Sequence, residues 1–316
     1  MSNILFVVHR YAPYPGGSEI NVQNMAEGLL ARGHDVTVLA ETHKGDYNNV
    51  KVTSDYQRLA DPWDLIVVHG GDVYYQNIVH LNGRRISSPV LYLIIKPSET
   101  DICMLGLHSH RFIGYGMTDE INHIKKHNVI KKARRIRYGI RHEGIIKTKS
   151  LSSDKKIFVS AGGFSTHKGM KPLAAAFESS DIHNAELHLY GYCNQELMPK
   201  QTDKVKVFFG LTKDEVYQAM ANADAYIMNS YDDGFGLVLL EAMMNKTPWF
   251  ARDISGAHDM ARWGTLHSTE HELMNNLRNF ERDDKKIEDA YDYVMANHTV
   301  QDTCNDIEDV LLETLR

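Results

Sequence analysis

One carboxylate, Glu241, interrupts the apolar run LVLLEAMM at residues 237–244, directly after the segment DDGFG. A carboxylate among aliphatic side chains costs several kcal/mol of desolvation unless hydrogen-bond donors surround it. The vicinal hydroxyls of a sugar are one source of donors, since an acidic residue of a dinucleotide-binding fold binds ribose in this way. A Lys or Arg from a neighbouring element is the other source. The residue types leave both alternatives open.

A second candidate is the segment GGFSTHKG at residues 162–169, which follows the apolar run IFVSA. A glycine turn, the hydroxyls of Ser165 and Thr166, and the Lys168 cation at a helix start would suit a diphosphate. The P-loop pattern GxxxxGK[ST] is absent, so neither ATP hydrolysis nor phosphoryl transfer is indicated. A surface lysine beside a helix cap is the alternative interpretation.

Two further candidates lie in the N-terminal half. Gly16 and Gly17, in YPGGSE, let the backbone approach a ligand closely at a helix N-terminus, although the GxGxxG spacing of a dinucleotide site is missing. His69 ends an apolar strand just before Gly70, Gly71 and Asp72, where its ring could donate a hydrogen bond to a substrate hydroxyl. A tight turn and a structural histidine are the respective alternatives.

Strands alternating with helices are predicted to position these residues. Strand 3–9, helix 20–34 and strand 35–40 open the chain, and strands 155–164, 185–192, 205–210 and 224–230 alternate with helices 169–180, 213–223 and 235–244. The pattern predicts two doubly wound α/β domains with parallel sheets. Ligands of such folds bind beyond the carboxyl ends of the strands, which is where the candidate loops stand.

The length of 316 residues, 43% of them hydrophobic, also favours two domains. We expect domains at 1–148 and 149–300, joined by a polar linker near 150–156, and a final helix at 301–316 that packs onto the body of the protein. Its apolar stripe is Ile307, Val310, Leu311 and Leu315.

Cysteine usage and hydropathy indicate the compartment. The three cysteines (Cys103, Cys193 and Cys304) form no CxxC pair, which argues against a disulfide framework or a zinc site. No apolar run has the length of a signal peptide core or a membrane span. A cytoplasmic protein is expected.

Charge is distributed unevenly along the chain. Residues 1–150 hold 19 Lys and Arg against 14 Asp and Glu, a net charge of +5, and residues 151–316 hold 16 against 27, a net charge of −11. The segment 125–149 contains ten Lys or Arg and the single acid Glu143. It is either a solvated face or a landing surface for an anionic acceptor such as DNA or a membrane, with these candidate contacts: Lys131, Lys132, Arg134 and Arg135.

Together these loops resemble retaining glycosyltransferases of the family-4 type. The opening unit of that family is similar to residues 14–40, YPGGSEINVQNMAEGLLARGHDVTVLA. Its donor-binding core is similar to residues 208–251, FFGLTKDEVYQAMANADAYIMNSYDDGFGLVLLEAMMNKTPWFA. The E-x7-E motif is met as Asp233, seven residues and Glu241. The resemblance implies the GT-B fold, in which two Rossmann-like domains face each other across a cleft. It also implies that the last helix, 301–316, packs back on the first domain.

The resemblance also implies roles for individual residues. Glu241 would bind the ribose of a nucleoside diphosphate sugar, Asp233 the transferred sugar, Lys168 the leaving diphosphate, and His69 the sugar near the reacting carbon. The donor-binding residues it implies are Gly16, Gly17, Gly163, Thr166, Gly191, Gly210, Leu211, Gly234, Phe235, Gly236, Leu237 and Glu241. Neither a metal nor a cofactor is implied, since the nucleotide sugar is itself the donor substrate.

Two positions depart from the family pattern. Asp233 is one methylene shorter than the usual Glu, and Gly163 stands where the family usually has an Arg that binds phosphate. One cation of the expected phosphate pair is therefore missing, and Arg10 is one candidate to replace it.

The expected activity is transfer of a hexose or pentose, with retention, to an acceptor hydroxyl on a lipid, a glycan precursor or a hydroxymethylated DNA base. A nucleotide-sugar epimerase or phosphorylase on the same fold is an alternative. So is a non-catalytic module that binds a nucleotide sugar or nucleic acid. The sequence does not decide the oligomeric state.

Overall fold

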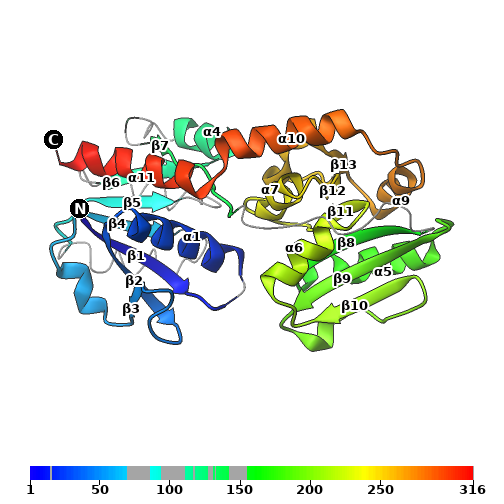
Figure 1. Cartoon of the computed structure of the whole chain (residues 1–316), viewed down its shortest axis with the longest axis horizontal. Coiled ribbons are helices and arrows are strands. Elements are labelled where there is room, and N and C mark those ends of the chain that lie inside the picture. The colour runs from blue at the N-terminus through cyan, green and yellow to red at the C-terminus, as the bar shows by residue number, and fades with distance from the viewer. Residues whose placement is uncertain are drawn as a thin grey trace. The chain divides into compact units, whose positions relative to one another are not determined.

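The computed structural model describes residues 1–14, 16–69, 86–93, 111–116, 118–126, 131, 133–141 and 155–315. It divides into two compact units, residues 1–141 with 297–316, and residues 142–296 (Figure 1). Each unit is a parallel sheet covered by helices on both faces, so the predicted fold class of two Rossmann-like α/β domains is confirmed.

The first unit is built on a seven-stranded parallel sheet in the order β3-β2-β1-β4-β5-β6-β7. Its elements are β1 (Asn3–Arg10), α1 (Gly17–Ala31), β2 (Asp35–Thr42), β3 (Lys51–Thr53), η1 (Tyr56–Ala60), β4 (Leu65–His69), β5 (Val90–Leu93), β6 (Arg111–Tyr115), α4 (Thr118–Lys126), β7 (Ala133–Arg135) and α11 (Val300–Thr314). The strand order reverses between β1 and β4, so the carboxyl ends of these strands form a topological switch point.

Two apolar layers enclose this sheet. Alternate side chains of β1, β2 and β4 pack on α1 and α11 on one face, and the intervening side chains pack on η1 and α4 on the other. Figure 1 shows α11 lying beside α1. In the predicted stripe of α11, Ile307, Val310 and Leu311 are buried as expected, but Leu315 is 62% exposed, because it lies past the last residue of the helix.

The second unit has a six-stranded parallel sheet in the order β10-β9-β8-β11-β12-β13. Its elements are β8 (Lys156–Gly163), η3 (Thr166–Lys168), α5 (Met170–Ser179), β9 (Ala185–Tyr192), η4 (Gln195–Leu197), β10 (Val205–Phe209), α6 (Lys213–Ala221), β11 (Ala225–Met228), α7 (Leu237–Met244), β12 (Trp249–Arg252), α8 (Ser255–His258), η5 (Ala261–Trp263), β13 (Thr265–His267), α9 (Glu270–Arg278) and α10 (Asp284–Asn297). Here the order reverses between β8 and β11.

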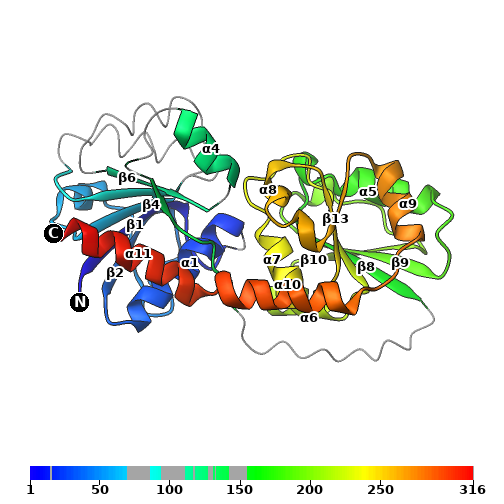
Figure 2. The same cartoon turned by 90° about the horizontal axis from the view of Figure 1, so that it is seen from above.

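Helices cover this second sheet as its apolar pattern requires. α5 and α9 pack together on one face, where Leu173, Phe177 and Leu273 join the core with Phe158 and Leu187 of the strands. α6 and α7 contact each other and lie on the opposite face (Figure 2). No helix in the described ranges is long and apolar enough to cross a bilayer.

Candidate functional site

The switch point of the second sheet brings together two loops that the sequence singles out. β8 ends in Gly162 and Gly163 and leads into the turn with Lys168, and β11, its neighbour in the sheet, leads into the loop with Asp233. Lys168 Nζ lies 2.5 Å from Asp233 Oδ2, and their side chains are 26% and 20% exposed. The predicted phosphate cation and the first acid of the motif are therefore direct partners.

The Asp233 loop is held close to backbone at the start of α7. Gly236 N–H donates to Gly256 O at 3.0 Å, and a Cβ on Gly236 would lie 2.9 Å from that oxygen. Gly236 is the N-cap of α7 and has no side-chain cap. The first backbone N–H groups of the helix are thus not capped by its N-cap side chain, as suits an anionic group.

Glu241 is 7% exposed and has protein partners, so its burial alone does not require a sugar. Its Oε1 accepts from Lys213 Nζ at 2.5 Å and from the Tyr217 hydroxyl at 2.9 Å. The structure shows the second of the two alternatives left open by the sequence, a cation from a neighbouring element. Within the described residues both contacts fall on Oε1, which leaves Oε2 to accept from a ligand. The expectation that Glu241 binds ribose therefore rests on the family resemblance.

Tyr226 links the two strands at the switch point of the second sheet. It is fully buried in the sheet, and its hydroxyl donates to Ala161 O at 3.0 Å and accepts from Ala161 N at 3.2 Å. Burial raises the pKa of this phenol, and the charges of Glu241 and Asp233 raise it further. Tyr226 therefore stays neutral at pH 7 and links β11 to β8, the two strands at the switch point.

The remaining glycines of the predicted donor site also lie at this sheet edge. A Cβ on Gly191 would lie 2.2 Å from the Phe164 ring, so this glycine leaves space for that ring. The Phe164 ring stacks on Phe209, 45% exposed at the end of β10, and Gly210 follows with φ 76°. Thr166 is exposed, Gly163 is buried, and Leu211, Gly234 and Leu237 are partly exposed.

In the first unit, Gly16 and His69 lie at the ends of α1 and β4. His69 is 3% exposed, and its Nε2 lies 3.3 Å from Asn21 Nδ2. A Cβ on Gly16 would collide with the carboxylate of Glu19, which Arg10 Nε holds at 2.7 Å. Arg10, the suggested replacement for the missing phosphate cation, is thus paired within its own unit. Gly17 is exposed, and residues 70–72 lie outside the described residues.

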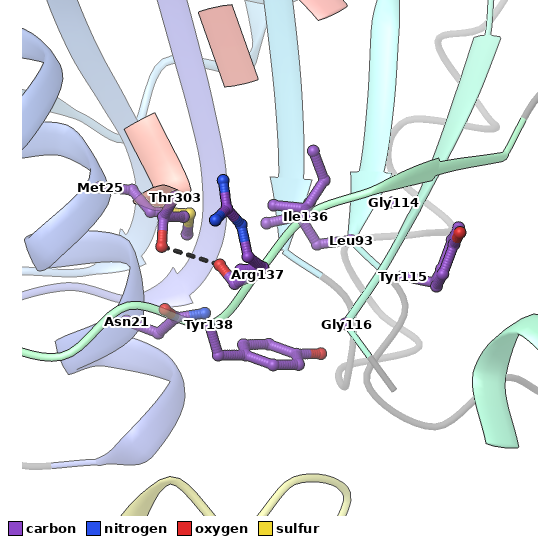
Figure 3. A pocket seen from close by; sticks show the side chains of 10 residues that line it. All are labelled: Asn21, Met25, Leu93, Gly114, Tyr115, Gly116, Ile136, Arg137, Tyr138 and Thr303. Carbon is purple, nitrogen blue, oxygen red and sulfur yellow. Dashed lines mark hydrogen bonds between the residues drawn. The ribbon is translucent and has the colours of Figure 1, made fainter. Parts of the chain in front are cut away.

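Asn21 also lines a small pocket of the first unit (Figure 3). The pocket is bordered by α1, β5, β6, the segment after β7, and Thr303 of α11, whose hydroxyl donates to Arg137 O at 2.7 Å. Asn21 Oδ1 is buried and has no hydrogen-bond partner among the described residues. No local sequence pattern indicates Asn21, Glu19, Lys213 or Tyr217, because each pairs with a residue of another strand or helix.

Part of the basic segment predicted as a surface for an anionic acceptor is paired with the C-terminal helix α11. Arg134 pairs with Glu313, and these hydrogen bonds raise the pKa of the guanidinium. Arg137 bonds two aspartates of α11, Asp302 at 3.0 Å and Asp306 at 2.6 Å. Lys131 and Arg135 are exposed, and Lys132 lies outside the described residues.

The comparisons with known proteins agree with this architecture. Residues 143–294 match the family described as Glycosyl transferases group 1, so the second unit carries a domain of that family. No curated protein sequence is detectably similar to the chain.

Solved structures with the same fold cover nearly the whole chain. Sucrose-phosphate synthase from Thermosynechococcus elongatus has a TM-score of 0.79 at 16% identity and covers 100% of this chain and 99% of its own. HepE from Anabaena, in complex with UDP and glucose, has a TM-score of 0.76 at 15% identity over 99% and 100%. WaaG, a glycosyltransferase involved in lipopolysaccharide biosynthesis, has a TM-score of 0.71 at 15% identity over 97% and 99%. The fold is that of GT-B glycosyltransferases.

Proposed function

We propose that this chain, whose second unit carries a glycosyl transferases group 1 domain, is a retaining glycosyltransferase that uses a nucleoside diphosphate sugar. The observation that carries the proposal is the contact of Lys168 with Asp233 at the switch point of the second sheet. HepE is described in complex with UDP-glucose, which makes a UDP sugar the first donor to test.

The Lys168–Asp233 pair has the charges that sugar transfer needs. A departing diphosphate gains negative charge as the glycosidic bond breaks, and a preorganised cation stabilises that charge more than a mobile one would. Lys168 would bind the diphosphate together with the start of α7, and Asp233 would accept from hydroxyls of the sugar. In the structure the two side chains neutralise each other, so neither is an unpaired, partly desolvated charge.

The Lys213–Glu241 pair suits the nucleoside half of the donor. Glu241 Oε2 would accept from a ribose hydroxyl, while Lys213 and Tyr217 hold Oε1 and fix the carboxylate plane. Phe209, the last residue of β10, has an exposed ring on which the nucleotide base could stack. A nucleotide and a sugar phosphate would thus be bound by side chains of one unit.

Retention and the acceptor class are finer parts of the proposal. No general base is needed on the far face of the sugar if the leaving phosphate assists attack on the near face, which is the mechanism the family resemblance implies. The acceptor hydroxyl is assigned to the first unit, and its class is one of three: a lipid, a glycan precursor or a hydroxymethylated DNA base. The paired arginines of the basic segment favour an acceptor that needs few phosphate contacts.

Donor binding tests the core of the proposal. Titration of the full chain with UDP, GDP and ADP sugars in a calorimeter should give saturable binding of one nucleotide class. Lys168→Met should weaken that binding about 10- to 100-fold, since a charge-assisted hydrogen bond contributes about 1.5–3 kcal/mol. Lys171→Met is the matched control, because Lys171 lies on α5 and bonds only Glu196 O within the described residues.

Product analysis tests the rest. The anomeric configuration of the transferred sugar, read by NMR, should match that of the donor. Epimerised donor in the absence of any acceptor would instead assign an epimerase. Undiminished binding by Lys168→Met would remove the diphosphate role of this residue.

A further inference from the structure

The turn that carries Lys168 is fastened to the end of β11. Tyr231 N–H donates to His167 O at 2.7 Å, and Asn229 Nδ2 donates to Gly169 O at 3.0 Å. Gly169 has φ 62°, and a Cβ there would lie 2.4 Å from Asn229 O. The backbone of the turn therefore rests directly on the backbone of the strand end.

A polar cluster of Asn229, Arg252 and Glu270, the first two of them buried, lies behind this junction. Arg252 Nη2 donates to Asn229 Oδ1 at 3.1 Å and to Glu270 Oε1 at 2.5 Å. Asn229 Nδ2 also lies 3.2 Å from Glu270 Oε1. Asn229 is 1% and Arg252 9% exposed, and the Glu270 side chain is 26% exposed, so the cluster extends from the interior of the unit to its surface.

His267 and Tyr231 complete the cluster. Burial, together with the Arg252 charge, lowers the pKa of His267 to about 4, so its ring is neutral at pH 7. Its Nε2 lies 3.1 Å from Asn229 Oδ1. Tyr231 donates its hydroxyl to Glu270 Oε1 at 2.7 Å, and its ring lies 4.3 Å from the Arg252 guanidinium carbon.

These contacts give the Asn229 amide a single orientation. Its oxygen accepts from Arg252 and faces the His267 ring, and its nitrogen donates to Gly169 O and Glu270. A flipped amide would set its NH₂ against the guanidinium and its oxygen against two acceptors. A buried ion pair of this kind is seldom a gain in stability over apolar packing, but removal of one partner is costly. Orientation is the property that it supplies here.

We propose that Arg252 and Glu270 are positioning residues that hold the Lys168 turn in its binding geometry. They act on the turn through Asn229, and on the Asp233 loop through Tyr231, which directly precedes it. The inference rests on the proposed function, because it assigns Lys168 to the diphosphate. None of the four candidate loops identified in the sequence contains either positioning residue.

Amide hydrogen exchange of the free protein tests the positioning itself. In Glu270→Gln and in the milder Tyr231→Phe, the amides of Lys168, Gly169 and Tyr231 should exchange about tenfold faster, because the junction opens locally. Glu272→Gln is the matched control, since Glu272 lies in the same first turn of α9 and accepts from Ser268 N at 2.8 Å. Exchange at the turn that does not exceed that of the control overturns the proposal.

Ligand binding tests the consequence for the site. Glu270→Gln should bind UDP about tenfold more weakly and uridine with unchanged affinity, because only the diphosphate contacts Lys168. An equal loss for UDP and uridine would mean that Glu270 has only a general structural role. If the unaltered protein binds no nucleoside diphosphate, the proposed function fails, and the exchange experiment still decides whether the cluster orders the turn.

Discussion

Replacing Lys213 should destabilise the protein more than replacing its partner Glu241. The side chain of Glu241 is 9% exposed and that of Lys213 is 35% exposed. Among the described residues, Lys213→Met leaves the buried carboxylate with the Tyr217 hydroxyl as its donor, whereas Glu241→Gln leaves a lysine that water can reach. The asymmetry in exposure therefore predicts an asymmetry in the free energy of unfolding.

The magnitude follows from the position of the pair between two limits. An exposed ion pair contributes at most about 1 kcal/mol, and removal of one partner of a fully buried pair costs about 3–5 kcal/mol. Because Lys213 is one-third exposed, water relieves part of the loss, and about 2 kcal/mol is expected for Lys213→Met. Glu241→Gln should cost less than about 1 kcal/mol, because Gln still accepts from Lys213 and Tyr217.

Urea unfolding of the two single variants and the double variant measures these values. The double variant should be more stable than the sum of the single losses predicts, with a coupling energy of about 1 kcal/mol. A coupling near zero, or a larger loss for Glu241→Gln than for Lys213→Met, would refute the assignment of Lys213 as the partner of the buried carboxylate.

Three further predictions concern the backbone at Gly169, the packing of α11 and the dependence of stability on pH. Gly169→Ala should lower stability by more than about 2 kcal/mol, because its Cβ would meet a carbonyl oxygen. Gly33→Ala, at φ 88° with no atom within 4 Å of the added Cβ, should cost only about 1 kcal/mol. Thermal unfolding measures both losses. Arg137→Met should cost about 2 kcal/mol and make α11 more susceptible to limited proteolysis, while the exposed Arg278→Met should change stability by less than about 0.5 kcal/mol. Because burial lowers the pKa of His267 to about 4, below its unfolded value of 6.5, the unfolded chain binds the extra proton between these pH values. Stability should therefore fall by up to about 3 kcal/mol as the pH drops from 6.5 to 4, and His267→Gln should flatten this dependence in urea titrations.

The strands and helices that were predicted from periodicity have close counterparts in the structure. The run AELHLYGY at residues 185–192 coincides with β9, because its alternating apolar residues fill one face of the sheet. Helix α1 begins at Gly17 instead of Ile20, because the first turn contains polar residues that carry no apolar periodicity. Glu19 in that turn bonds Arg10 of the preceding strand, a contact that no local pattern reveals.

The loops of the candidate site were predictable, but their partners were not. Glycine turns after strands mark the ends of β8 and β10 directly in the sequence, because backbone that approaches a ligand or another chain segment excludes side chains. Lys213 and Glu241 lie 28 positions apart and on different helices, so only the packing of α6 on α7 brings them together. Arg252 likewise reads as one more residue of an apolar strand until the fold places Glu270 beside it.

The basic segment shows why charge runs are a weak guide to partners. Arg134 and Glu313 are separated by 179 positions, and Arg137 and Asp306 by 169. The basic segment left an anionic acceptor and a solvated face as alternatives, and the acidic α11, which belongs to the first unit, supplies negative charge from within that unit. A sum over residues 1–150 omits this helix and so overstates the free positive charge of the first unit. Charge should therefore be counted by unit after the fold is known, and an acceptor of low charge becomes the simpler expectation for this protein.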